Sequence, residues 1–78
     1  MIAIQQLTGL VEEATQSLPG KVGPDTELAA LDGWDSMGLV VFVELVQSKV
    51  GVELAVHELR ACATPAEVLE LIRRQLAA

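Results

Sequence analysis

Apolar residues recur every three or four positions near the start of the chain, and this spacing constrains the fold more than any other feature. Because an α-helix turns once every ~3.6 residues, such residues line one face of a helix. The apolar positions are Ile4, Leu7, Val11, Ala14 and Leu18. We therefore expect a first helix over residues 2–18, ended by Pro19-Gly20.

The segment over residues 36–50 allows two interpretations. Its centre, Leu39-Val40-Val41-Phe42-Val43, is rich in β-branched residues and resembles a buried strand. Three features favour a helix instead: the apolar stripe continues to Val50 at helical spacing, Asp35 and Ser36 are good N-cap residues, and Gly51 suits a helix C-terminus. No other part of the sequence supplies a strong partner strand, so we expect a helix.

The last helix has the clearest start signal in the sequence. Thr64-Pro65-Ala66-Glu67 combines an N-cap residue, a proline in the first helical position and a capping-box glutamate. Its expected inner face comprises Val68, Leu71, Ile72 and Leu76. A short element over residues 56–61 precedes it.

Residues 19–34 show no helical period, which is long for a connection inside a small domain. Leu28, Leu31 and Trp34 predict an ordered loop held on the core, with one short turn over residues 27–31. The predicted fold class is all-α. It is a small four-helix bundle of three longer helices and one short one, with a long ordered loop between helices 1 and 2.

Length and charge restrict the organisation and the partners. The 78 residues fit one domain over residues 1–78, and the single cysteine excludes an internal disulfide framework. A net charge of −6 repels phosphate backbones, so we expect no nucleic acid partner. No apolar stretch approaches the roughly 20 residues of a membrane span, and no secretory signal is evident. We expect a cytoplasmic monomer that does not bind a membrane.

The sequence offers no readable catalytic constellation. His57 is the only histidine and Cys62 the only cysteine, so a structural zinc site is excluded and no metal site is expected. We expect His57 at the surface and Cys62 as a small core residue. The stretch from Gly33 to Gly38 superficially resembles a hydrolase nucleophile elbow, but its glycines are misplaced around Ser36 and no histidine–acid pair is apparent.

Ser36 is distinguished by its position. It is expected to open a helix after an ordered loop, where unpaired N–H groups and the helix dipole favour negative charge. An anion attached to its hydroxyl would therefore be stabilised. Position alone favours the plainer interpretation that Asp35 or Ser36 is an ordinary N-cap residue, because aspartate and serine are the commonest ones.

Asp35-Ser36-Met37 at the start of the second long helix resembles the Asp-Ser-Leu attachment motif of acyl and peptidyl carrier proteins. The resemblance extends over nearly the whole chain through the helix order, the length, the acidic charge, the loop leucines and Gly51-Val-Glu-Leu54. It implies that a phosphopantetheinyl transferase attaches 4′-phosphopantetheine from coenzyme A to Ser36, with Asp35 as a supporting residue. It further implies a non-catalytic carrier that holds acyl or aminoacyl groups as thioesters.

The predicted second helix is apolar nearly all round in its first two turns. Met37, Val40, Val41 and Glu44 lie on a face different from the predicted core stripe, and we expect this face to be an exposed docking surface. Burial of both faces is the alternative. The resemblance implies three kinds of partner: the transferase, an acyl- or aminoacyl-loading enzyme, and a downstream synthase, transferase or tailoring enzyme.

Two departures from the carriers of fatty-acid synthesis bear on the pathway. Between Ser36 and Val50 the only acid is Glu44, whereas those carriers typically have many; Met37 and Gly38 also replace the usual residues. Together with Trp34, this resembles free-standing carriers of polyketide, nonribosomal peptide or related specialised metabolism. A fatty-acid carrier and an unmodified helical interaction module are the alternatives. Gly38 lowers helix propensity by about 1 kcal/mol relative to alanine. Either the close approach of a partner or of the phosphopantetheine arm, or simple tolerance near the helix start, explains it.

Overall fold

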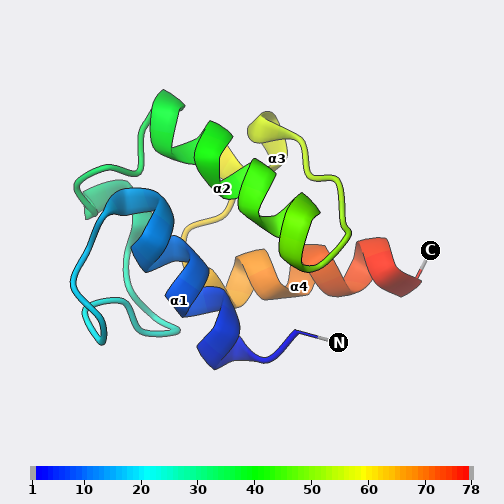
Figure 1. Ribbon diagram of the computed structural model, residues 1–78, viewed down its shortest axis with the longest axis horizontal. Coiled ribbons are helices and arrows are strands. Elements are labelled where there is room, and N and C mark those ends of the chain that lie inside the picture. Colours follow the sequence, from blue (N-terminus) through cyan, green and yellow to red (C-terminus); the bar gives the residue numbers. More distant parts are fainter. Residues whose placement is uncertain (1, 78) are drawn as a thin grey trace.

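The computed structural model describes residues 2–77 and confirms the all-α class, with no strand among the residues described (Figure 1). The elements are α1 (Ile4–Thr15), the 3₁₀ turn η1 (Leu28–Ala30), α2 (Ser36–Lys49), α3 (Val56–Arg60) and α4 (Pro65–Ala77). Helix α1 packs against α2 and α4, and the short α3 packs against α2. No helix within residues 2–77 is both long enough and apolar enough to cross a membrane.

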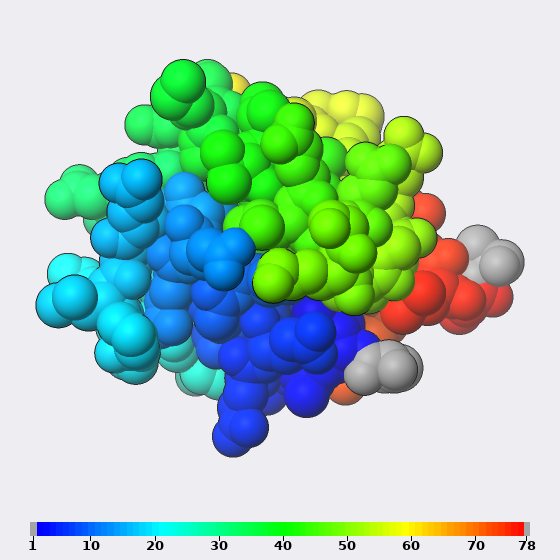
Figure 2. All heavy atoms as spheres, viewed as in Figure 1, coloured from blue at the N-terminus to red at the C-terminus, as the bar shows by residue number. Residues whose placement is uncertain are grey.

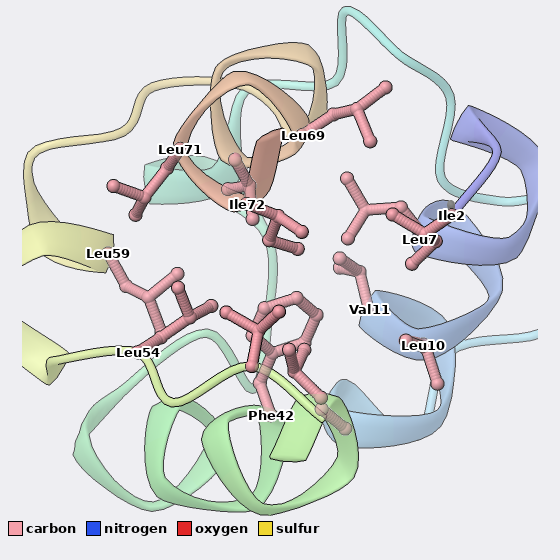
Figure 3. Close-up of a cluster of buried hydrophobic side chains, with 14 of the residues drawn as sticks. Ile2, Leu7, Leu10, Val11, Phe42, Leu54, Leu59, Leu69, Leu71 and Ile72 are labelled. Atoms are coloured by element: carbon pink, nitrogen blue, oxygen red, sulfur yellow. The ribbon is translucent and has the colours of Figure 1, made fainter. Parts of the chain in front are cut away.

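One apolar cluster holds the helices together (Figure 3). Phe42 from α2 projects between the side chains of α1 and α4 and is fully buried. The other fully buried members of this cluster include Leu7, Val11, Leu28, Leu39, Val46, Leu59, Val68 and Ile72. The choice of helix over strand for α2 is confirmed, because Leu39, Phe42 and Val46 recur at helical spacing on the buried face.

Helix α1 is shorter than its apolar pattern predicts. It ends at Thr15 because Gln16 adopts a left-handed conformation, with φ of 58°. The prediction that Leu18 lies on the buried face is therefore wrong, and this side chain is 76% exposed. Glutamine is not a residue that favours positive φ, so the sequence carries no signal for a helix end there.

Helix α4 begins as predicted. The Glu67 N–H donates to Thr64 Oγ1 at 3.4 Å, and Glu67 Oε1 accepts from the Ala63 N–H at 3.2 Å. Its inner face is buried through Ile72, but Leu76 is 46% exposed, so its predicted burial is wrong. Leu69, which the one-face pattern leaves out, is buried.

The loop after α1 is ordered at its beginning by a carboxylate from α1. Glu12 Oε2 accepts hydrogen bonds from the Gly20 N–H at 2.8 Å and the Val22 N–H at 3.0 Å. Glu12 lies on the face predicted to be polar, and it is half-buried beneath this loop. Val22 is buried, so the loop contributes to the core as well as covering it.

The rest of the loop is held to the start of α4. The Leu28 N–H donates to the Ala63 carbonyl oxygen at 2.9 Å, and the Ala66 N–H donates to the Pro24 carbonyl oxygen at 3.1 Å. Leu28, in η1, is fully buried. The predicted ordered loop and its short turn are thus confirmed. The loop ends at the start of α2.

Candidate functional site

The start of α2 is built around Asp35. Its carboxylate Oδ1 accepts from the N–H groups of Met37 and Gly38, each at 3.1 Å, and its carbonyl oxygen accepts from the Leu39 N–H at 2.8 Å. Asp35 is therefore the N-cap residue, and Ser36 is the first residue of the helix. Asp35 thus uses two of the N–H groups at this helix end, and they are not free for another anion. This differs from the prediction that unpaired N–H groups at the helix start favour an anion on Ser36.

Two glycines allow close backbone approach, one between the loop and the end of α1 and the other between the start of α2 and the loop. Gly33 has φ of +91°, a conformation that favours glycine, and a Cβ there would lie 2.8 Å from the Thr15 carbonyl oxygen. A Cβ on Gly38 would overlap the Gly33 carbonyl oxygen. Gly38 is thus explained by close backbone approach within the chain, which is neither of the two explanations that the sequence suggests.

Trp34 holds the last part of the loop on the core. Its ring packs edge-on against Phe42, with ring centroids 5.3 Å apart and an interplanar angle of 66°. Leu31 also packs against the buried cluster. These contacts leave little freedom in the backbone that leads into Asp35 and Ser36.

The Ser36 side chain is exposed, and one cation lies beside it. Arg60, the last residue of α3, donates from Nη2 to Ser36 Oγ at 3.0 Å. Because a guanidinium has only donors, the hydroxyl oxygen accepts, and its own proton remains available to a base outside this chain. The two residues lie 24 positions apart, and sequence reasoning did not identify Arg60.

An apolar face extends from Ser36 along α2. Met37 is 79% exposed, Val40 is 49% exposed and Val41 is 38% exposed, and Glu44 is exposed one turn further along. Figure 2 shows the atoms of α2, in green, as a continuous band across the upper part of the visible face. The opposite side of the same helix is buried, so one helix supplies both a core face and an apolar surface.

The remaining candidate groups lie apart from any catalytic arrangement. His57 is exposed on α3. Cys62 is half-buried against the core, and burial raises the pKa of its thiol above its ordinary value, with Glu67 and Glu58 adding to the rise and Arg74 opposing it. A low-pKa, nucleophilic thiol is therefore not present here. Within residues 2–77 no group of three or more His, Cys, Asp or Glu side chains could hold a metal ion.

Comparison with protein families identifies the chain. Residues 5–72 match the family model for the phosphopantetheine attachment site. The chain belongs to this family of acyl and peptidyl carrier domains. Comparisons with curated proteins and with solved structures gave no match. Carrier domains of this family bear a covalently attached 4′-phosphopantetheine and are themselves non-catalytic, which agrees with the expected cofactor and the expected class of protein.

The start of α2 fits this prosthetic group. Phosphopantetheine is joined to a carrier through a phosphodiester on a hydroxyl, and Ser36 presents an exposed hydroxyl on a rigid helix start. A guanidinium lies beside the oxygen that would be esterified. The carrier domain therefore has a suitable acceptor atom and a local positive charge where the added group is negative.

Proposed function

We propose that Ser36 is the residue to which the 4′-phosphopantetheine arm is attached. The single observation that supports this assignment best is the exposed hydroxyl of Ser36 on the first turn of α2, directly after the Asp35 cap, inside the matched segment. The arm supplies a thiol that holds acyl or aminoacyl groups as thioesters. The chain supplies the acceptor oxygen, the rigid turn beneath it and a surface on which partner enzymes dock.

The attachment is tested by intact mass. Purified apo protein is incubated with coenzyme A and a broad-specificity phosphopantetheinyl transferase, beside a Ser36→Ala control. We expect the mass of one phosphopantetheinyl group to be gained by the wild type and not by the control. No gain on a folded protein, with more than one transferase, would contradict the proposal and favour an unmodified helical interaction module. The family match counts against that alternative.

We propose Met37, Val40, Val41 and Glu44 as the docking surface for the transferase and for the enzymes that load and use the arm. The support is their exposure and their position next to Ser36. Val40→Asp should lower acyl transfer by a partner enzyme while leaving the unfolding transition unchanged. Leu76→Asp is a matched control, because Leu76 is similarly exposed but lies near the end of α4. Loss of folding in Val40→Asp would mean that this face is core.

We propose that the carrier serves polyketide, nonribosomal peptide or related specialised metabolism. The observation that favours this over fatty-acid synthesis is the apolar character of the α2 surface, on which Glu44 is the only acid. Docking on such a surface depends little on ionic strength, because screening acts on charges. The pathway assignment is tested by incubating the modified protein with loading enzymes of each class and measuring acylation by mass. Efficient, salt-sensitive loading by the fatty-acid enzyme alone would contradict it.

The expectations of a free-standing, monomeric, cytoplasmic carrier stay predictions. The size of the native protein in a lysate of its source cells, measured by immunoblot and by gel filtration, tests the first two. Fractionation of the same lysate tests the third.

A further inference from the structure

Arg60 is the residue that contacts the proposed attachment oxygen from outside α2. Its Nη2 lies 3.0 Å from Ser36 Oγ, and it reaches this atom from the end of α3, which packs against α2. The contact is exposed to solvent. Arg60 can therefore contact a group carried on Ser36 without any change in helix packing.

Arg60 has no carboxylate partner within residues 2–77, although acids outnumber basic residues by eleven to five in the sequence. The ion pair found in that part of the chain joins Arg73 to Glu70 at 3.3 Å. A guanidinium carries five N–H donors, and the Ser36 hydroxyl accepts from only one of its nitrogens. The guanidinium beside Ser36 can therefore interact with an anion that residues 2–77 do not supply.

Two backbone donors close to such an anion are already used. The N–H groups of Met37 and Gly38 donate to the Asp35 carboxylate, which also brings a negative charge to the helix start. A phosphodiester on Ser36 is repelled by Asp35 and attracted by Arg60. Phosphate oxygens and guanidinium form strong charge-assisted hydrogen bonds with matching geometry.

We propose that Arg60 forms an ion pair with the phosphodiester that joins the arm to Ser36, and so positions the first atoms of the arm toward α3. This inference rests on the proposed attachment at Ser36. The charged oxygens are bonded to the phosphorus that is in turn bonded to Oγ, so they lie next to the atom that Arg60 already contacts. Attachment of the arm then strengthens the contact between α2 and α3, because a neutral acceptor is replaced by an anion.

Thermal unfolding of apo and modified forms tests the ion pair. Wild type, Arg60→Gln, Arg60→Lys and Arg73→Gln are each converted to completion, as judged by intact mass, and melted at low and high salt. Arg73→Gln is the matched control, because it removes the same charge from an exposed arginine away from Ser36. We expect modification to raise the Tm of the wild type by about 1–8 °C more than it raises the Tm of Arg60→Gln.

The other variants separate this ion pair from a general charge effect. Arg73→Gln should keep the wild-type response, Arg60→Lys should keep part of it, and high salt should reduce it. Equal responses in wild type and Arg60→Gln at full conversion would overturn the ion pair and leave the attachment intact. No mass gain in any variant would instead contradict the attachment, so the two failures are distinguishable.

A second measurement uses the wild type alone and does not depend on how well the variants are modified. The Arg60 side-chain N–H resonances are followed by NMR before and after modification, with those of Arg73 as internal reference. We expect a shift at Arg60, reversed in part by high salt, and none at Arg73. An unchanged Arg60 signal in fully modified protein would overturn the proposal.

Discussion

The contact between the backbones at Gly33 and Gly38 makes one substitution diagnostic. Gly38→Ala adds a single methyl group to α2, where alanine would normally improve helix stability by about 0.5–1 kcal/mol. The added Cβ overlaps the carbonyl oxygen of Gly33. Gly9→Ala is the matched control, because Gly9 lies within α1 and a Cβ there meets nothing within 4 Å.

The two substitutions should change stability in opposite directions. At Gly38 the obstacle is backbone, so relief requires the loop or the helix start to move, and overpacking of this kind costs about 1–3 kcal/mol. Such a movement also disturbs the Asp35 cap on the Gly38 N–H, which adds about 1 kcal/mol. After the gain in helix propensity, the net loss is about 2 kcal/mol. That loss lowers Tm by roughly 8–16 °C, whereas Gly9→Ala raises Tm by roughly 2–8 °C.

Urea and thermal unfolding followed by far-UV circular dichroism measure both changes on the apo protein. The rate of modification by the transferase, measured at a temperature where both variants are folded, should fall for Gly38→Ala only, because the turn beneath Ser36 moves. A Gly38→Ala variant as stable as the wild type would refute the argument from close approach. Equal destabilisation by Gly9→Ala would show that the loss does not arise from the Gly33 contact.

Three further predictions follow from other contacts. Asp35→Ala should lower the free energy of unfolding by about 1 kcal/mol in urea titrations, because the start of α2 loses its cap. Glu12→Gln should speed hydrogen exchange at the two loop amides that donate to its carboxylate, while Glu13→Gln, on the exposed side of α1, leaves them unchanged. Burial raises the pKa of Cys62 above the ordinary value for a thiol. The stability due to its protonated thiol is therefore complete below that ordinary pKa and is lost as the pH rises through the folded-state pKa. A Cys62→Ala variant should lack this alkaline loss, and iodoacetamide should modify Cys62 more slowly than the thiol of an attached arm.

The helices could be predicted because their signals are local. The spacing of Leu39, Phe42 and Val46 fixes the buried face of α2, and Thr64 with Glu67 fixes the start of α4. The ends of elements were less predictable. Leu18 continues the spacing of α1, yet the backbone turns at Gln16 and Leu18 is exposed beyond that turn.

The same distinction between local signals and long-range packing applies to the site. Ser36 and its Asp35 cap could be predicted from neighbouring residues, and so could the exposed apolar face, because a helix with two apolar faces in a small bundle can bury only one of them. Arg60 could not be predicted, since it meets Ser36 only through the packing of α3 on α2. Gly38 did carry a signal, because a glycine inside a helical pattern indicates either a weak helix or a close neighbour, but the sequence does not name that neighbour.

The hydrogen bonds that join the loop to Ala63 and Ala66 have a consequence for the order of events during synthesis of the chain. The loop before Ser36 finds these partners only after the residues that begin α4 have emerged and reached it. A nascent or truncated chain that ends before them presents Asp35 and Ser36 on a loop without its native contacts. An enzyme that recognises the native turn would therefore modify completed chains in preference to unfinished ones, and the attached arm would mark molecules that have finished folding.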